Sequence, residues 1–329
     1  MKTTDTPHPT TTRRQVLVTA GTGLGAAAAS LLVSPAAGQD ATPPATPAAG
    51  GASGEAINSV QYTHIEKIYF YIPPFTDDAF VARIHGVDVD TYLAIRADFE
   101  AAAHGAAEEL LADDTFTAMV DSLPFEPGSV VAAIGSSTTD DLQSWFEILR
   151  HLVTMRRPDD GIEFVNEGIS GQTSTDALGR AMQIAMQQPA WVFCLLAPND
   201  VWRYGSEPTK TLVSIEETEK NLAEIRRIVT SETGASWTWI TNAPVDESRL
   251  YAFPGMSIID PNADLDRINE FMFAQPEPVV DTNAVFGDPT GSDLISPDGL
   301  HPSLAGQTMI ARTVVETLAE RAGGGTGTR

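Results

Sequence analysis

The feature that most constrains the fold is a regular alternation of short apolar runs and amphipathic stretches from residue 128 onward. Five runs have the length and composition of buried strands and end in polar or glycine-rich residues: 129–134, 162–171, 191–200, 236–244 and 276–283. The first three segments between them, and the segment after the last, carry apolar residues at helical spacing. This pattern predicts a three-layer α/β/α fold with a roughly five-stranded parallel sheet. Functional groups should then lie on loops at the carboxyl ends of the strands.

The first residues have the pattern of an export signal rather than of a folded domain. Arg13 and Arg14 form a twin-arginine pair, followed by a weakly hydrophobic, Ala/Gly-rich stretch and small residues at 36–38. We therefore expect 1–38 to be a twin-arginine-type signal peptide, which predicts a periplasmic, cell-envelope or extracellular location. The alternative is a membrane anchor, but polar residues and glycines interrupt the apolar run at 16–33. We expect no membrane span in the mature chain.

Two further features of the N-terminal region bear on domain organisation. The Gly-x-Gly-x-x-Ala match at 21–26 lacks the strand context and the acidic partner of a dinucleotide site, so it predicts no cofactor. Residues 39–56 form a Pro/Ala/Gly/Thr tract that cannot bury a core, and they are predicted to be a disordered linker.

At the other end of the chain, the glycine-rich residues 323–329 are predicted to be a flexible tail.

Residues 57–125 are predicted to form a mainly helical extension before the α/β domain. Apolar residues recur at helical spacing within 90–123. The aromatic stretch 61–75 is β-like and ends at a Pro-Pro pair. Its histidine, His64, is interpreted as a surface or packing residue, and so is His85.

Composition excludes some classes of partner. The formal net charge is −24 and the pI about 4.4, so the surface repels phosphate backbones and we expect no nucleic-acid partner. The single cysteine, Cys194, lies in an apolar run and is interpreted as a buried, inert thiol. The oligomeric state stays open.

The loop after the first strand reads IGSSTTDD, residues 134–141. A serine there would lie at a helix N-terminus, where unpaired N–H groups favour negative charge and suit a serine whose carbonyl adduct becomes an oxyanion. Thr138 and Asp141 are spaced as in a capping box. Taken alone, the loop is also compatible with an ordinary polar turn.

The loops after the second and third strands carry candidate oxyanion donors. In NEGISGQTS, Gly168 and Gly171 let the backbone approach a ligand, and the N–H of Gly171 is a candidate donor. In LLAPNDVW, the side-chain amide of Asn199 is another. The alternatives are a flexible turn for the first loop and an Asx turn or helix N-cap for the second.

The last loop, SPDGLHPS, places Asp298 three residues before His301. A carboxylate on Nδ1 keeps a histidine in the tautomer that a general base needs. Gly299 permits a tight turn, and Pro302 begins the final helix. The close spacing favours a joint role for Asp298 and His301 over two solvated residues.

Taken together, the four loops carry Ser, Gly, Asn and Asp-x-x-His in chain order, each after a successive strand. This order resembles the SGNH (GDSL-type) esterase/lipase family over roughly residues 126–320, so we expect a flavodoxin-like SGNH hydrolase domain at 126–322. The matching blocks are VVAAIGSSTTDDLQSW, NEGISGQTS, APND and SPDGLHPS. The chain has no Gly-x-Ser-x-Gly motif, which argues against the α/β-hydrolase elbow.

The resemblance assigns roles to these residues. Ser137 is the nucleophile, His301 the general base and acid, and Asp298 the group that orients His301. The N–H groups of Ser137 and Gly171 and the side chain of Asn199 form the oxyanion hole. No metal or other cofactor is needed.

Two positions depart from the family pattern. Ser136 stands where the family usually has aspartate, so hydrogen bonds around the nucleophile can differ, and it adds a second hydroxyl beside Ser137. Ala197 replaces a glycine of the third block, which can crowd the loop.

We therefore expect an exported serine esterase that hydrolyses carboxylic esters through an acyl-serine. An acetylated glycan, a short acyl ester and a lipid remain open as substrates. Trp202 and Tyr204 are candidates to line the substrate pocket or, equally, core aromatics. The main alternative is a non-catalytic SGNH-fold module that binds envelope glycan or lipid. A third hypothesis is a structural envelope protein.

Overall fold

The computed structural model describes residues 52–204, 209–250, 256–257 and 261–324. The predicted signal peptide, 1–38, therefore lies outside the described residues, as do most of the predicted linker and tail. Within the described part of the chain, no helix is both long enough and apolar enough to span a bilayer.

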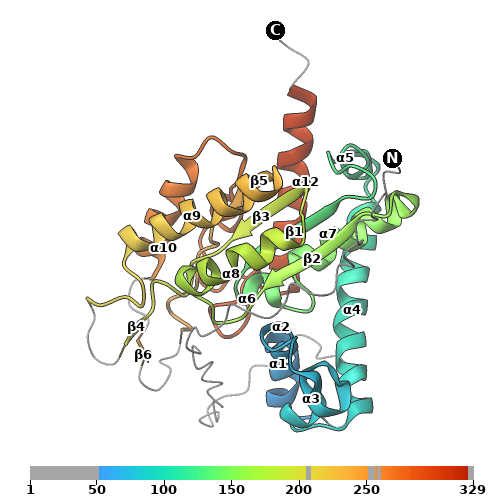
Figure 1. The fold of residues 1–329 in the computed structure, drawn as a ribbon, viewed down its shortest axis with the longest axis vertical. Coiled ribbons are helices and arrows are strands. Elements are labelled where there is room, and N and C mark those ends of the chain that lie inside the picture. The colour runs from blue at the N-terminus through green and yellow to red at the C-terminus, as the bar shows by residue number, and fades with distance from the viewer. Residues whose placement is uncertain (1–51, 205–208, 251–255, 258–260, 325–329) are drawn as a thin grey trace, which may run out of the picture. The chain divides into compact units, whose positions relative to one another are not determined.

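A five-stranded parallel sheet forms the centre of the structure (Figure 1). Its strands are β1 (Val130–Gly135), β2 (Glu163–Gly168), β3 (Trp191–Leu195), β5 (Ser236–Ile240) and β7 (Val279–Val280). Their order is β2-β1-β3-β5-β7, and each neighbouring pair is parallel. This is the flavodoxin-like order, in which the chain changes direction between β1 and β3 and leaves a crevice at their carboxyl ends. A separate antiparallel pair joins β4 (Arg203–Tyr204) to β6 (Met256–Ser257).

Successive side chains of the strands enter two different cores. In β1, Val131 and Ala133 face one core, whereas Ala132 and Ile134 face the other. The first core lies under α4 (Val89–Leu111), α5 (Asp114–Asp121), α7 (Trp145–Arg156) and α12 (Leu304–Gly324). The second lies under α8 (Ser174–Met186), α9 (Ile215–Thr233) and α10 (Pro261–Phe273). Strands buried on both faces read as continuous apolar runs, and the predicted three-layer fold is confirmed.

Helix ends follow local sequence signals. Thr173 and Asp176 form a capping box at the start of α8, and Ser144 and Ser214 cap α7 and α9. Helix α9 ends at Thr233 and is followed by the C-cap Gly234, which has a φ of 72°. The remaining short helices are α6 (Ser137–Asp140), α11 (Thr282–Phe286) and the 3₁₀ turn η2 (Pro158–Asp160).

The fifth strand is shorter than predicted. The sequence pattern covered 276–283, but only Val279 and Val280 pair with β5. As an edge strand, β7 has a single neighbour, and Asp281 already caps α11 by accepting the N–H of Ala284. The helix cap therefore ends the strand early.

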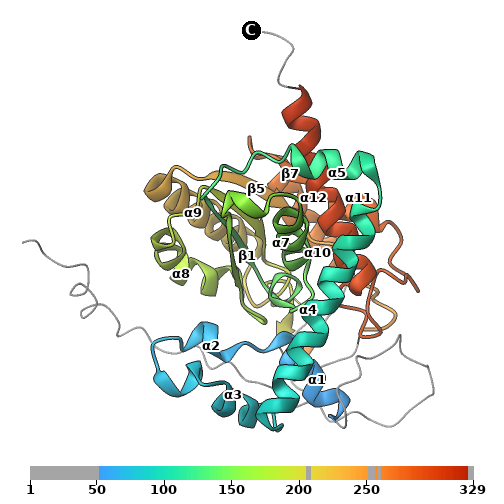
Figure 2. The same ribbon diagram turned by 90° about the vertical axis from the view of Figure 1, so that its right-hand side faces the viewer.

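The N-terminal extension is helical, with a small core of its own. It contains α1 (Gly54–Tyr62), α2 (Ile65–Ile68), the 3₁₀ turn η1 (Pro73–Thr76) and α3 (Asp78–Ile84). Ile57, Val60, Val81, Tyr92 and Ile95 are among the side chains of this core. Helix α4 runs from this small core to the first core under the sheet (Figure 2).

The predicted β-like character of 61–75 is wrong. The stretch contains the end of α1, α2 and η1, with Pro73 and Pro74 at the start of η1. Aromatic and β-branched residues favour strands only where a sheet edge is present to pair with. Here Ser53 caps α1, and Ile57 and Val60 bury one face of that helix, so packing decides the conformation.

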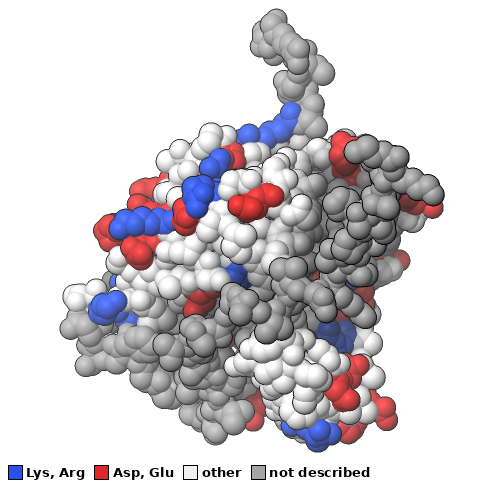
Figure 3. Space-filling view, viewed as in Figure 1, with Lys and Arg blue, Asp and Glu red and all other residues white. Residues whose placement is uncertain are grey.

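Charged side chains of both signs lie side by side over α9 on the face drawn in Figure 3. Exposed ion pairs there join Lys220 to Glu217 and Arg227 to Glu224. Such pairs contribute little to stability individually, but they place cations among the carboxylates of a strongly acidic chain.

Candidate active site

The turn after β1 brings Ser137 to the start of α6. Gly135 ends the strand, and a Cβ there would lie 2.2 Å from the hydroxyl oxygen of Thr139, so only glycine fits. Ser136 is the N-cap of α6 without a side-chain capping bond. The predicted capping box between Thr138 and Asp141 is wrong, because α6 is a single turn and Asp141 already lies at its C-terminal end.

His301 lies between Ser137 and Asp298. Its Nε2 is 2.9 Å from the hydroxyl oxygen of Ser137, and its Nδ1 is 2.6 Å from a carboxylate oxygen of Asp298. An ionised carboxylate can only accept, so Nδ1 carries the proton and the neutral ring presents the Nε2 lone pair to the hydroxyl. The structure thus brings Ser137, from the first loop, to the Asp298–His301 pair of the last loop.

The Asp298–His301 turn is held by its own backbone. The second carboxylate oxygen of Asp298 accepts the N–H groups of Leu300 at 2.8 Å and of His301 at 3.0 Å. Gly299 has a φ of 75°, and a Cβ there would lie 2.7 Å from the carbonyl oxygen of Asp246. Only glycine fits both the conformation and the space, so this turn fixes the carboxylate relative to the ring.

The charges of this pair shift both pKa values. Burial lowers the pKa of His301. The carboxylates of Asp298 and then of Asp141 outweigh burial, so the pKa of His301 lies above its ordinary value. Burial raises the pKa of Asp298, but His301 and the backbone N–H groups outweigh burial and hold this pKa below its usual range. Asp298 is therefore ionised at neutral pH, as a group that orients an imidazole must be.

The structure distinguishes the two adjacent serines. Ser136 is fully buried, and its hydroxyl has no hydrogen-bond partner among the described residues. Only the hydroxyl of Ser137 contacts His301. Ser136 therefore does not replace the hydrogen bonds of the usual family aspartate, and a different carboxylate, Asp140, ties this turn to its neighbours.

Candidate oxyanion donors lie near Ser137. The first N–H groups of a helix have no intrahelical acceptor, and Ser137 is the first residue of α6. One amide hydrogen of Asn199 is held by the carbonyl of Gln172 at 2.8 Å, which orients the amide and leaves its second hydrogen available. Asn199 lines a pocket together with Ser137 and His301. Gly171 has a φ of 78° and is not among the residues that line this pocket.

Asp200, beside Asn199, joins the second and third loops. It is fully buried, and its two oxygens accept the N–H of Ser174 at 2.8 Å and the hydroxyl of Thr218 at 2.7 Å. Burial raises the pKa of this carboxyl. The sequence indicated that so polar a pair after a buried strand needs hydrogen bonds, but it did not indicate which groups supply them.

Ala197 has a strained backbone. Its φ is 81°, in the left-handed region that favours glycine, and its side chain is fully buried. Because alanine stands here in place of the family's glycine, the backbone is strained two residues before Asn199. The side chain itself packs in the second core.

The pocket beside Ser137 and His301 is mainly apolar. Its wall includes Leu195, Pro198, Val245, Phe286, Ile295 and Leu300. Trp202 is not among the lining residues; it is 8 % exposed and packs in the second core, as the alternative reading of this residue predicted. The side chain of Tyr204 lies outside the described part of the structure.

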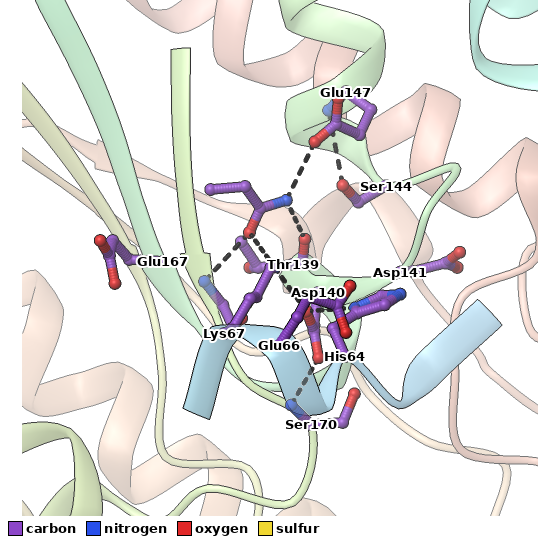
Figure 4. Close-up of polar contacts among 12 residues, drawn as sticks. His64, Glu66, Lys67, Thr139, Asp140, Asp141, Ser144, Glu147, Glu167 and Ser170 are labelled. Atoms are coloured by element: carbon purple, nitrogen blue, oxygen red, sulfur yellow. Dashed lines mark hydrogen bonds and ion pairs between the residues drawn. The ribbon is translucent and has the colours of Figure 1, made fainter. Parts of the chain in front are cut away.

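Sequence reasoning missed a group of residues from the N-terminal extension. The ring of Tyr62 stacks on the ring of His301, with a centroid distance of 4.5 Å and an interplanar angle of 25°. His64, which is buried, lies 2.7 Å from Asp140, and Lys67 donates to the same carboxylate at 2.6 Å (Figure 4). No local pattern marks these residues, because their partners lie more than 70 positions away in the sequence.

Within the part of the chain that the structure describes, no group of three or more His, Cys, Asp or Glu side chains is arranged to hold a metal ion. Cys194 is buried, and burial raises the pKa of its thiol, so the thiol stays protonated at neutral pH.

A model of the GDSL-like lipase/acylhydrolase family matches residues 129–309, which include Ser137, Gly171, Asn199, Asp298 and His301. The chain belongs to this family. As a GDSL-like acylhydrolase it is a carboxylic ester hydrolase, and the resemblance found in the sequence is confirmed.

No curated protein matches the chain. Similar solved structures include Axe2, an acetylxylan esterase from Geobacillus stearothermophilus, with 23 % identity, 59 % of this chain and 95 % of that chain covered, and a TM-score of 0.47. LAE5, an α/β hydrolase enzyme from the metagenome of Lake Arreo, Spain, has 23 % identity, coverages of 59 % and 96 %, and a TM-score of 0.48.

Proposed function

We propose that this GDSL-like hydrolase is a serine esterase that works through an acyl-serine. The observation that carries the proposal is the pair of contacts made by His301, 2.9 Å to the Ser137 hydroxyl and 2.6 Å to Asp298. A hydroxyl, an imidazole and a carboxylate in this order form an activated nucleophile.

In the first half-reaction, Ser137 Oγ attacks the carbonyl carbon of the ester while its proton passes to His301 Nε2. The N–H groups of Ser137 and Gly171 and the amide of Asn199 would donate to the oxyanion that forms. When the C–O bond to the alcohol breaks, His301 returns the proton to the leaving oxygen. Asp298 stays ionised throughout and stabilises the imidazolium.

In the second half-reaction, water attacks the acyl-serine. His301 Nε2 takes a proton from the water, and a second tetrahedral adduct forms at the same carbonyl carbon. Its collapse releases the carboxylic acid, and His301 returns the proton to Ser137 Oγ. The enzyme is regenerated without any other co-reactant.

We infer that the acyl group of the substrate is short. The cavity beside Ser137 has a volume of about 30 Å³ and a mostly apolar wall. A single water molecule needs ~10–15 Å³ by the same measure, so the space suits a group of about acetyl size. A long acyl chain would exceed this volume. We therefore expect p-nitrophenyl acetate to be hydrolysed faster than p-nitrophenyl octanoate.

Export by the twin-arginine route is part of the proposal and is supported by the sequence around Arg13 and Arg14. In a bacterial host with a twin-arginine system, replacing both arginines with lysine should leave the precursor uncleaved inside the cell. Equal export of this double variant and the wild type would contradict that part of the proposal.

The decisive experiment compares Ser137→Ala with Ser136→Ala on a panel of p-nitrophenyl esters, together with labelling by a fluorophosphonate probe. Ser137→Ala should lose both activity and labelling. Ser136→Ala is the matched control: its hydroxyl is buried without a partner among the described residues, so both signals should remain. A wild type that neither labels nor hydrolyses any ester would favour a non-catalytic binding module instead.

A further inference from the structure

We propose that residues 61–67 of the N-terminal extension belong to the active site, with Tyr62 as a positioning residue that holds the ring of His301. The inference rests on the proposed function of His301 as the general base. It concerns a segment that lies outside the residues matched by the family model, 129–309.

Tyr62 supplies a contact with His301 that the triad lacks. Ser137 and Asp298 bond to the two nitrogens at the edge of the imidazole, which leaves rotation about the line joining them unrestrained. The stacked ring of Tyr62 covers one face at 4.5 Å and 25°, and so opposes that rotation. Edge and face contacts together hold the orientation that proton transfer needs.

Tyr62 acts as a neutral surface rather than as an acid or base. Burial, and then the carboxyl groups of Asp141 and Asp298, raise the pKa of Tyr62 well above its ordinary value. The phenol is therefore un-ionised at neutral pH.

Neighbouring contacts hold Tyr62 in place. The amide of Gln61 donates to Asp141 at 3.0 Å, and its carbonyl accepts the N–H of Leu142 at 3.3 Å. The side-chain amide of Gln307 donates to the other oxygen of Asp141 at 3.3 Å. Gln307 lies on α12, six residues after His301. The extension, the nucleophile helix and α12 thus meet at one buried carboxylate.

The same segment holds the glycine loop. Lys67 and His64 bind one oxygen of Asp140, on the nucleophile helix, and Lys67 also donates to the carbonyl of Gly168 at 3.0 Å (Figure 4). These contacts are polar and directed at the catalytic loops. The small apolar core of the extension is formed mainly by other residues, such as Ile57 and Ile95, and Ile65 packs against it.

The test compares Tyr62→Ala, Tyr62→Phe and Tyr71→Ala in the full chain, with p-nitrophenyl acetate as substrate. Tyr71 is the matched control, a tyrosine of the same extension that is 67 % exposed. Tyr62→Ala should lower kcat by roughly tenfold to a hundredfold with little change in KM, because it frees the imidazole without removing a substrate contact. Tyr62→Phe keeps the stack and should restore kcat, and Tyr71→Ala should match the wild type.

A second readout does not depend on turnover. Burial lowers the pKa of His301, whereas Asp298 and Asp141 raise it. Opening one face to water in Tyr62→Ala should therefore move the pKa of His301 upward in an NMR titration of its ring, and the acidic limb of kcat/KM should move with it. Neither should move in Tyr62→Phe or Tyr71→Ala.

The two readouts separate the positioning role from the proposed reaction. A Tyr62→Ala variant with wild-type kcat and an unchanged His301 titration would overturn the positioning role. Loss of kcat in Tyr71→Ala as well would also overturn it, because the effect would then be one of general stability. Failure of Ser137→Ala to lose activity would instead contradict the esterase mechanism and leave the His301 titration to decide the role of Tyr62.

Discussion

The carboxylate of Asp140 accepts the backbone N–H of Ser170 at 2.8 Å. This bond joins the helix that begins with Ser137 to the loop that contains Gly171. The other oxygen of Asp140 binds His64 and Lys67, which lie 76 and 73 positions upstream, so this segment holds both catalytic loops. Burial raises the pKa of Asp140, but Lys67 and then His64 bring it down to about 2.

Lys67→Met should destabilise the protein in a pH-dependent way. It leaves a buried carboxylate with one partner fewer, at an expected cost of about 1–3 kcal/mol in the free energy of unfolding at pH 7. Because the folded pKa of Asp140 is depressed, its contribution is present above the unfolded value of 3.8 and is lost as the pH falls toward 2. The difference between variant and wild type should therefore shrink below pH 4.

Urea unfolding at pH 7 and pH 3 checks this. Lys220→Met is the control, since the Lys220 side chain is 74 % exposed and pairs with Glu217 at the surface. Its effect should stay within about 0.5 kcal/mol at both pH values. A Lys67→Met variant as stable as Lys220→Met would show that Asp140 does not depend on Lys67.

Asp141 should impose the opposite pH dependence. Burial raises its pKa to about 6, so the folded state retains a proton that the unfolded state releases near 3.8. Stability should therefore fall as the pH rises from 4 through 6, by about 2–3 kcal/mol for a shift of this size. In Asp141→Asn, which cannot ionise, this part of the slope should be missing.

The comparison is made by urea unfolding at half-unit intervals between pH 4 and pH 7. Asp140→Asn serves as the control: because the pKa of Asp140 is shifted in the other direction, this variant should keep the fall in stability between pH 5 and pH 6. Parallel curves for the wild type and Asp141→Asn would show that Asp141 is ionised throughout.

Asp298→Asn should abolish most of the activity with little effect on folding. An asparagine amide would donate to Nδ1, so the neutral ring would present a proton, rather than a lone pair, to Ser137. We expect kcat to fall by about 10³–10⁴-fold. Asp293→Asn, at an exposed position in the same loop, should retain wild-type kcat.

The wild-type pH profile follows from the same pair. His301 must be neutral to act as a base, and its pKa is raised, so kcat/KM should fall roughly tenfold for each pH unit below a pKa that lies above 6.5. An acidic limb of the kcat/KM profile centred below pH 6.5 would contradict this, because burial would then lower the pKa of His301 by more than Asp298 and Asp141 raise it.

Ala197→Gly should cost much less than other buried alanine-to-glycine changes. Glycine relieves the strain of a φ of 81°, which offsets the loss of a buried methyl group. We expect a change within about 1 kcal/mol. Ala181→Gly, equally buried but within α8, should cost about 2 kcal/mol because helix propensity is lost as well. Equal losses of thermal stability in the two variants would contradict the strain at Ala197.

The five strands, most helices of the α/β domain and the four loops that carry candidate groups could be predicted from the sequence. The spacing of apolar residues, the helix caps and the glycines that end helices are local signals in the sequence. In a sheet of parallel strands, the carboxyl ends of the strands lie at one edge, so the loops that follow them come together. The Asp298–Gly299–His301 turn was also readable, because its hydrogen bonds close within three residues.

The packing of whole elements determines which serine meets His301, where the Ala197 backbone is strained, and that Trp202 lies in the core. It also decided that 61–75 is helical and that Tyr62, His64 and Lys67 lie against the catalytic loops. Ser137 and His301 are 164 positions apart, and Gln61 and Asp141 are 80 apart. Contacts over such distances depend on how complete elements pack, and no local pattern encodes them.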